Sequence, residues 1–309
     1  LKRMDAVKDY FIDSWETLKG RNISEDNQEM LQMKFDKMYT TKDIYTIYNW
    51  MLDDCGCDLL PEVPYEKRKL PYEDVFPMLY LKYRLSGGNS THKNIKHLVI
   101  DEMQDYTYLQ YTILESLFHC RMTILGDRAQ TLDTKQQDVL RFLPKLLGRE
   151  IRTIEIKKSY RNTLEIARYA EKVSGVSDLE LLDRHGKEVV EKTFNTDTEL
   201  LDELVCHLKC PGDFETAALI TTTEEEAFDL SRLLKLRGIN VSYVDRNSSA
   251  FKKGLTVTTF YLAKGLEFDQ VFALRGAKEN PLKNQAEYIC ATRALHELYV
   301  YEIADSLSK

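Results

Sequence analysis

The run His97-Leu98-Val99-Ile100-Asp101-Glu102 is the stretch that decides how the chain is expected to fold. Consecutive apolar residues followed by two carboxylates are typical of a buried parallel strand that ends at a polar site. Further apolar runs, separated by amphipathic stretches, lie at 122–125, 151–156, 217–220, 240–244, 255–259 and 270–274. This alternation of short strands and helices predicts an α/β fold with parallel sheets.

The residues before this run have a different character. Apolar residues recur at helical spacing over roughly 5–52, which predicts a helical segment. Four prolines between residues 61 and 77 predict a connector with a short helix after Pro71, and Ser86-Gly87-Gly88-Asn89-Ser90 predicts a second break. The expected domains are a helical segment and connector over 1–70, a first α/β domain over 71–147 and a second over 148–309.

Composition limits the classes of function. The chain has 309 residues, enough for two domains, and a formal net charge of −7. That charge argues against binding nucleic acid mainly through a basic surface, although a local groove stays open as an alternative. The sequence has no apolar run long enough to span a bilayer and no signal-peptide pattern at its start, so we expect a cytoplasmic protein without a membrane partner.

The six cysteines predict neither a disulfide framework nor a metal site. They are too sparse for a disulfide scaffold, and we expect reduced thiols. Cys206 and Cys210 are one helical turn apart and could offer two metal ligands, but a zinc site needs four and no second pair stands out. Buried structural cysteine is the preferred interpretation of this pair.

Five blocks of polar residues follow the predicted strands in a fixed order. They are Asp101-Glu102, Leu125-Gly126-Asp127-Arg128-Ala129-Gln130, Lys158-Ser159-Tyr160-Arg161-Asn162, the run from Leu262 to Asp269, and Cys290-Ala291-Thr292-Arg293-Ala294-Leu295. A strand ending in two acids is common on its own, but the ordered set resembles the UvrD/Rep type of superfamily 1 helicases over about 72–300. The resemblance implies RecA-like parallel-sheet domains of the P-loop NTPase type, the first of them incomplete, in an ATP-dependent motor.

The resemblance also implies roles for residues of the first α/β domain. Asp101 would hold Mg²⁺, and Glu102 would act as the base or water-orienting carboxylate of ATP hydrolysis. Gln130 would sense the γ-phosphate. Phosphoryl transfer depends mainly on positioning and on stabilising charge, which these residue types can provide.

Residues of the second α/β domain would complete the site in the same resemblance. Tyr160 would stack on the nucleotide base, and Arg161 and Arg293 would act as two arginine fingers that reach the γ-phosphate. Gly265 and Glu267 would lie near the phosphate and ribose of the nucleotide. The alternative for each arginine is an ordinary surface salt bridge.

The sequence lacks one part that such a motor requires. A Gly-x-x-x-x-Gly-Lys-Ser/Thr loop, whose amides and lysine neutralise the phosphates, does not occur, and Gly186-Lys187 does not qualify because Glu188 follows it. In the family this loop precedes the strand that ends in the two acids. We therefore expect the chain to be the C-terminal portion of a longer protein, and to be unable to hydrolyse ATP without the missing N-terminal half.

Two departures from the DNA-helicase pattern indicate which motor this is. The run Thr131-Leu132-Asp133-Thr134-Lys135 lacks the aromatic residues that stack on single-stranded DNA, and Tyr261 stands where the family usually has histidine. With Tyr72-Glu73-Asp74 and Leu79-Tyr80-Leu81-Lys82, these features resemble HelD-like proteins, which act on RNA polymerase. The expected partner is therefore RNA polymerase, with weak DNA binding. The alternatives are a UvrD-type DNA translocase and a non-catalytic binding module.

Overall fold

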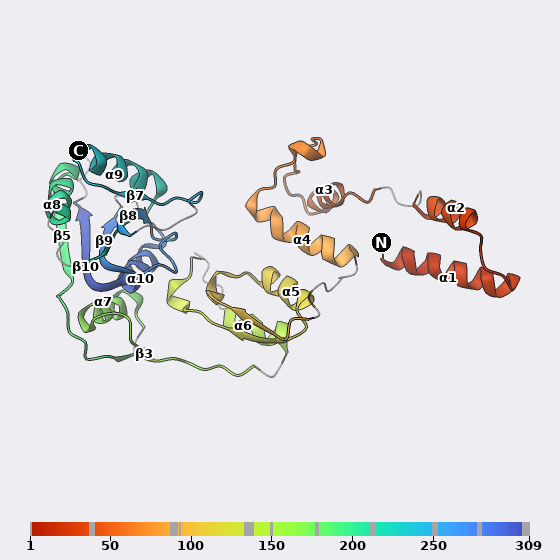
Figure 1. The fold of residues 1–309 in the computed structure, drawn as a ribbon, viewed down its shortest axis with the longest axis horizontal. Coiled ribbons are helices and arrows are strands. Elements are labelled where there is room, and N and C mark those ends of the chain that lie inside the picture. Colours follow the sequence, from red (N-terminus) through yellow and green to blue (C-terminus); the bar gives the residue numbers. More distant parts are fainter. Residues whose placement is uncertain are drawn as a thin grey trace. The chain divides into compact units, whose positions relative to one another are not determined.

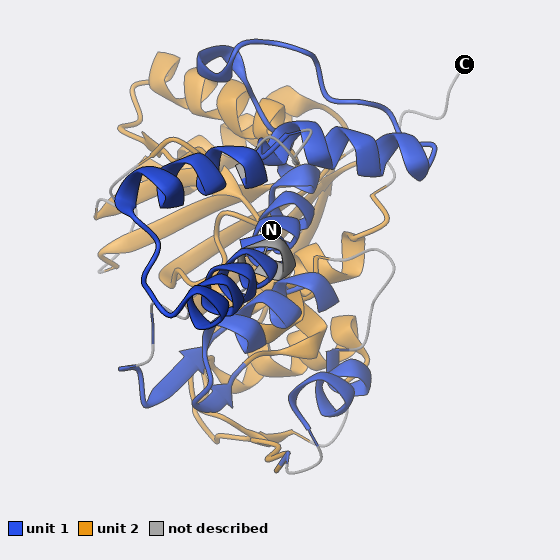
Figure 2. Cartoon of the chain, turned by 90° about the vertical axis from the view of Figure 1, so that its right-hand side faces the viewer, with its two compact units in different colours: residues 1–101, 106–125, 139–151 blue, residues 102–105, 126–138, 152–309 orange. Residues whose placement is uncertain are grey.

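A computed structural model describes residues 2–36, 41–86, 92, 94–132, 139–148, 151–176, 179–209, 214–248, 253–276 and 280–304. The chain forms two compact units (Figures 1 and 2). Unit 1 comprises residues 1–101, 106–125 and 139–151, and unit 2 comprises 102–105, 126–138 and 152–309. The break predicted at 87–90 lies outside the described residues, as do positions 133–135 of the run after Gln130. The domain bounds predicted from the sequence stay predictions.

Unit 2 is built on a six-stranded sheet in the order β5-β10-β9-β6-β8-β7. Every pair of neighbouring strands in it is parallel. The strands are β5 (Val190–Phe194), β6 (Thr216–Thr221), β7 (Ser242–Tyr243), β8 (Gly254–Thr259), β9 (Phe268–Arg275) and β10 (Ala294–Ile303). The α/β class with parallel strands, as predicted from the alternating apolar runs, is confirmed.

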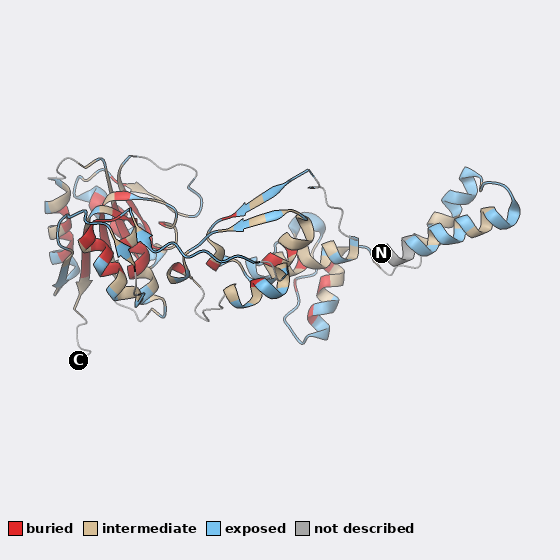
Figure 3. Ribbon diagram, turned by 90° about the horizontal axis from the view of Figure 1, so that it is seen from below, coloured by how far each residue is buried: buried red, intermediate tan, exposed pale blue. Residues whose placement is uncertain are grey.

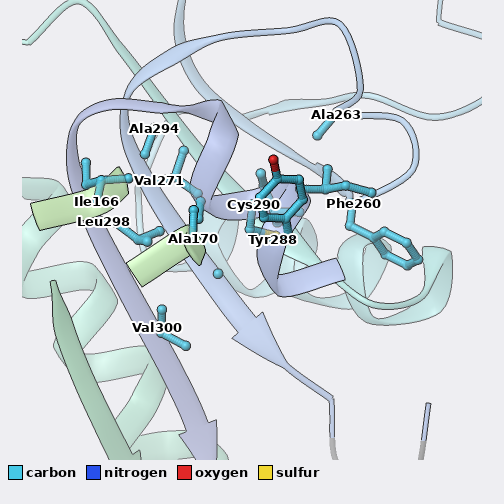
Figure 4. Close-up of a cluster of buried hydrophobic side chains, with 14 of the residues drawn as sticks. Ile166, Ala170, Phe260, Ala263, Val271, Tyr288, Cys290, Ala294, Leu298 and Val300 are labelled. Atoms are coloured by element: carbon cyan, nitrogen blue, oxygen red, sulfur yellow. The ribbon is translucent and has the colours of Figure 1, made fainter. Parts of the chain in front are cut away.

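Both faces of this sheet are covered by helices, and the central strands β6 and β9 each contain a continuous apolar run for that reason. On β9, Val271 and Ala273 pack with α7 and α10, whereas Phe272 points to the other face and packs with α8 and α9. The first of these clusters is drawn in Figure 4, and the buried strands are visible in Figure 3. The four helices are α7 (Leu164–Ser174), α8 (Asp197–Lys209), α9 (Glu224–Leu236) and α10 (Lys283–Arg293).

The loop 260–267 crosses one face of the sheet. It leads from β8 to β9, which lie on opposite sides of β6, so a crossing is unavoidable. Phe260 and Ala263 anchor it in the cluster shared with α7 and α10, and Ala263 is fully buried. The loop therefore delivers Lys264 and Glu267 to the amino end of β9.

Unit 1 contains helices that confirm the predicted helical segment. They are α1 (Lys2–Lys19), α2 (Glu25–Asp36), α3 (Ile44–Asp54) and α4 (Tyr72–Ser86), with the short 3-10 turn η1 (Tyr65–Lys67) between the last two. Tyr48 and Met78 share a small core between α3 and α4. The helix predicted after Pro71 is longer than expected because it continues through Pro77, where burial of the neighbouring Met78 offsets the backbone hydrogen bond that proline cannot make.

The two acids predicted at a strand end follow a small parallel sheet. It consists of β1 (His97–Ile100) and β2 (Arg121–Ile124), paired in parallel and packed with α5 (Tyr108–Leu117) and α6 (Val139–Leu147). Ile100 is buried in this cluster, but Val99 on the opposite face is 60% exposed. A two-stranded sheet is marginal by itself, and one face of this one is uncovered among the described residues of unit 1.

The strand predicted at 151–156 is wrong. These residues are irregular and exposed in the structure, with Ile154 at 70% and Ile156 at 78% exposure. The described residues offer this segment no strand to pair with until β3 (Lys158–Ser159), which pairs with β4 (Glu180–Leu181). The apolar, β-branched residues of this run predicted a strand, but the run pairs with no neighbouring strand among the described residues. None of the described helices is both long and apolar enough to cross a bilayer.

Candidate functional site

The residues after β1 and β2 that belong to unit 2 approach each other closely because Gly126 has no side chain. A Cβ on Gly126 would lie 2.5 Å from both Gln104 Oε1 and Met103 Cγ. Gln104 is 6% exposed and uses this proximity: its Oε1 accepts from the Asp127 amide at 3.0 Å, and its Nε2 donates to Glu102 Oε2 at 2.6 Å. Glu102 has a φ of 54°, a left-handed conformation that non-glycine residues rarely adopt. The hydrogen bond from Gln104 therefore holds Glu102 in its strained backbone conformation.

Lys264 joins these segments to the sheet of unit 2. Its side chain is only 8% exposed, and its ammonium lies 2.5 Å from Asp105 Oδ2 and 3.7 Å from Glu102 Oε2. It also donates to the Gln130 carbonyl oxygen at 2.8 Å. The next residue, Gly265, has a φ of 78°, which favours glycine and lets the loop turn after the lysine. One cation thus fixes both the acidic segment 102–105 and the short helix that ends at Gln130.

Arg293 is the most buried cation of the candidate site. It ends α10, directly before Ala294, and is 3% exposed. Its guanidinium donates to the Leu266 carbonyl, Gln130 Oε1 and Thr292 Oγ1, each at 3.3 Å. These acceptors are all uncharged, and Arg293 Nε is buried without a hydrogen-bond partner among the described residues.

Electrostatic surroundings make this guanidinium costly to bury. Burial is the main cause that lowers the pKa of Arg293, and the neighbouring positive charge of Arg161 lowers it further. The nearby carboxylates of Glu102, Glu267 and Asp127 act in the opposite direction. An arginine remains protonated at physiological pH, so a desolvated charge beside a second cation would gain stability from a bound anion.

Arg161 reaches the same place from another part of the chain. Ala294 of β10 pairs with Phe268 of β9, so Arg293 and Glu267, which immediately precede them, lie at the amino ends of neighbouring strands. Arg161 Nε contacts Glu267 Oε1 at 2.7 Å. The next residue, Asn162, is buried and donates from Nδ2 to the Ala294 carbonyl at 2.6 Å, which holds this loop against α10 and β10.

Gln130 lies at the centre of the arrangement. It ends the 3-10 turn η3 (Arg128–Gln130) and is 7% exposed. Its Nε2 donates to Asp127 Oδ2 at 2.9 Å, and its Oε1 accepts from Arg293. The same Asp127 oxygen accepts from the Tyr288 hydroxyl at 2.8 Å. Gln130 is therefore held between an acidic and a basic side chain, both of which are themselves fixed.

Unit 2 thus brings together five of the eight predicted site residues: Glu102, Gln130, Arg161, Glu267 and Arg293. Gly265 belongs to the same loop as Glu267. Asp101 lies in unit 1, where it is exposed directly after β1, and Tyr160 is 62% exposed after β3. The exposed ring of Tyr160 is available for stacking on a ligand.

Other residues of the arrangement had no role in the predictions from sequence: Gln104, Asp105, Asp127, Lys264 and Tyr288. Asp127 and Lys264 lie inside the motif blocks, and Gln104 and Asp105 closely follow the first block. Their positions in the sequence indicated that they lie near the site, but not which residues they contact. Tyr288 precedes the last block by two residues, and helical spacing could not have suggested that it shares a site with Arg293, because five residues turn a helix by about 140°.

The five cysteines that the structure describes make none of the contacts of this site. The described cysteines have free thiols, and no cluster of three or more metal-ligating side chains occurs in the part of the chain that is described. The prediction that Cys206 is buried is wrong, because α8 turns Leu200, Leu204 and Val205 to the sheet and leaves Cys206 on its outer face. Cys210 lies outside the described residues.

Two solved structures are similar to parts of the chain. The C-terminal domain of a possible DNA helicase from Lactobacillus plantarum WCFS1 is 26% identical, with 47% of this chain and 88% of that domain covered and a TM-score of 0.40. The helicase of PRRSV is 16% identical, with 85% of this chain and 46% of that chain covered and a TM-score of 0.39. No family model and no curated protein matches the chain.

Replacing Lys264 tests whether one buried ammonium holds the site together. We expect Lys264→Met to lower the free energy of unfolding by about 1.5–3 kcal/mol, because it removes charged hydrogen bonds and leaves the Asp105 carboxylate without its cation. Urea unfolding of this chain, followed by circular dichroism at neutral pH, measures the change.

Lys253→Met is the matched control. Lys253 contacts Glu215 at 2.6 Å, but its side chain is 81% exposed, so the same substitution should leave the free energy of unfolding nearly unchanged. Equal losses of stability in the two variants would show that Lys264 is an ordinary surface cation.

Proposed function

We propose that this chain is the C-terminal part of an ATP-driven, helicase-like motor, and that unit 2 supplies the residues that contact the terminal phosphate of the nucleotide. The observation that carries the proposal is Arg293, a guanidinium that is only 3% exposed and whose hydrogen-bond acceptors are all uncharged. Arg161 lies close enough to disfavour its charge. An anionic ligand would relieve both the unpaired Nε and the repulsion between the two cations.

The shape of the cationic group favours a phosphate as that anion. Guanidinium groups match phosphate oxygens with several N–H donors in a plane, and a second arginine adds charge where phosphoryl transfer develops it. Gln130 would contact the γ-phosphate beside Arg293, and Glu102 would polarise the attacking water. The ordered motif blocks, which resemble those of UvrD/Rep-type helicases, support the assignment of these roles.

The expected cofactors are ATP and Mg²⁺, and the residues present fit both. Asp101 offers an exposed carboxylate at the end of β1, and Mg²⁺ in nucleotide sites is commonly held by one or two carboxylates together with phosphate oxygens. When bound, Mg²⁺ would neutralise phosphate charge. Tyr160 would stack on the base, and Gly265 and Glu267 would lie near the phosphate and ribose.

We further propose that hydrolysis requires a segment that carries the phosphate-binding loop, which the sequence lacks. Its backbone amides and lysine would bind the phosphates from the side opposite to Arg161 and Arg293. The two-stranded sheet of β1 and β2, with Val99 60% exposed, is consistent with further strands being added to it. The isolated chain is therefore expected to bind nucleotide weakly and not to turn it over.

RNA polymerase is the proposed partner, in the manner of HelD-like proteins. Where a DNA helicase would present aromatic rings after Gln130, Leu132 is partly buried and packs on the core with α10. Tyr261, at the position of the usual histidine, donates its hydroxyl to Glu224 at 2.8 Å. Neither residue forms an open stacking platform for single-stranded DNA, and the net charge of −7 does not favour DNA.

Substitution of the proposed catalytic residues tests the motor itself. In the protein that contains the phosphate-binding loop, Glu102→Gln should retain nucleotide binding and stop turnover, because the amide keeps the size but cannot accept a proton. Arg293→Ala and Arg161→Ala should each slow hydrolysis by a factor approaching roughly a thousand. Steady-state ATPase rates at saturating nucleotide measure both effects.

Arg237→Ala is the control for these variants. Arg237 also forms an ion pair, with Asp202 at 2.6 Å, but this pair lies on the surface of α8 and α9. Its ATPase rate should equal that of the wild type. Rates within two-fold of wild type for Glu102→Gln and both arginine variants would remove these residues from catalysis.

The proposed partner predicts how nucleic acid and polymerase affect the ATPase. The complete protein should co-purify with RNA polymerase at physiological salt, and single-stranded DNA should stimulate its ATPase only slightly, because no aromatic platform follows Gln130. Pull-down and ATPase assays on one preparation check both points. Strong DNA stimulation and duplex unwinding without polymerase binding would favour the UvrD-type alternative and leave the motor assignment intact.

A further inference from the structure

We infer that Asp127 and Tyr288 are positioning residues that fix the orientation of the Gln130 side-chain amide toward Arg293. This inference rests on the proposed function, in which Gln130 contacts the terminal phosphate. It adds two residues to that site, neither of which would touch the nucleotide. They would act by deciding which end of the Gln130 amide faces the phosphate position.

Asp127 is the first of the two positioning residues. Its Oδ1 accepts from the Ala129 amide at 3.0 Å, which caps the turn η3, and its Oδ2 accepts from Gln130 Nε2 at 2.9 Å. The carboxylate is therefore held by the backbone of the same short turn whose last side chain it orients. An ionised carboxylate can only accept hydrogen bonds, so it selects the NH₂ end of the Gln130 amide.

The opposite orientation of Gln130 is disfavoured at both ends. If the amide turned by half a rotation, its oxygen would face Asp127 Oδ2 and its NH₂ group would face Arg293 Nη2. Two acceptors would then meet on one side and two donors on the other, and Gln130 and Arg293 are both buried, so water could not readily make up either loss. Asp127 and Arg293 thus allow one orientation, with the oxygen on the arginine.

Tyr288 connects this orientation to α10. It is 8% exposed and lies in the same buried cluster as Phe260 and Cys290 (Figure 4). Its hydroxyl donates to Asp127 Oδ2 at 2.8 Å, and burial together with the Asp127 charge raises the pKa of the phenol, so the proton stays on Tyr288.

Tyr288 and Arg293 lie on the same helix, five residues and about 7.5 Å apart along its axis. The turn η3 is thus bound to α10 at two points, through Asp127 at one and through Gln130 at the other. A shift of α10 would break the first contact and release the Gln130 amide. The orientation of Gln130 therefore depends on how α10 is seated.

The test is a double-mutant cycle in the ATPase-competent protein. Tyr288→Phe keeps the buried ring and removes only the hydroxyl, and we expect it to lower kcat by roughly ten- to hundred-fold, because misplacing a reacting group by a small distance has effects of that size. On a Gln130→Ala background the same substitution should change kcat by less than about two-fold, since the group that it orients is gone. Asp127→Asn, which exchanges an acceptor oxygen for a donor, should behave in the same way.

Tyr169→Phe is the matched control. Tyr169 is 7% exposed in the same cluster and its hydroxyl also donates to a buried carboxylate, Glu287, at 3.0 Å, so its loss should perturb folding to a similar extent. We expect an unchanged kcat on both backgrounds for this variant. Thermal unfolding of all variants separates a loss of fold from a loss of positioning.

Two outcomes would overturn the inference in different ways. If Tyr288→Phe lowers kcat by the same factor with and without Gln130, or leaves kcat unchanged, Tyr288 does not act through Gln130 and the inference fails while the motor stands. If Gln130→Ala and Arg293→Ala themselves leave kcat unchanged, the proposed function fails, and the roles of Asp127 and Tyr288 fail with it.

Discussion

The buried guanidinium of Arg293 is the constraint on which the rest of the site depends. A desolvated cation with uncharged hydrogen-bond acceptors and a second cation nearby is costly to bury, and the rest of the fold has to supply that free energy. The amino ends of β9 and β10 hold Glu267 and Arg293 side by side, and Asn162 fastens the loop of Arg161 to β10. In the proposed function, the phosphate of the nucleotide would offset part of this cost.

Lys264 holds the acidic segment 102–105 and the short helix that ends at Gln130 in place. It lies in the loop that crosses the sheet, and its contacts with Asp105 and the Gln130 carbonyl connect the strand-end segments to the core of unit 2. Gly126 makes this approach possible, because any side chain at that position would collide with Gln104. A glycine and a buried lysine therefore decide where the carboxylate of Glu102 sits relative to the two arginines.

The apolar runs of the sequence predicted the central strands correctly because burial on both faces leaves a continuous apolar signal, as in β6 and β9. The same rule failed at 151–156, where exposed isoleucines have no neighbouring strand to pair with among the described residues. The runs do not predict β10, because its apolar residues follow Arg293 without a break and continue the pattern of a late helix. At Pro77 the sequence predicted too short a helix, because packing of Met78 keeps α4 intact around the proline.

The motif blocks contain most of the residues that meet in unit 2, and three of the five blocks follow strands that the apolar runs predict, namely β1, β2 and β8. Their partners could not be named in this way. The pairing of Lys264 with Asp105, and of Tyr288 with Asp127, joins residues 159 and 161 positions apart, and only the folded chain brings them together. Sequence spacing carries no information about such long-range pairs when neither residue has an unusual chemistry of its own.

The most direct test of the account is a titration of this chain with tripolyphosphate, which carries the charge of the nucleotide without its base. The side-chain signals of Gln130, Arg161 and Arg293, observed by nuclear magnetic resonance on isotope-labelled protein, should shift together in a saturable manner. The shifts of Gln130 and Arg161 should disappear in Arg293→Ala and persist in Arg237→Ala. Tripolyphosphate that moves only exposed lysine signals, with Gln130 and both arginines unaffected, would contradict the claim that the buried guanidinium is built to receive a phosphate.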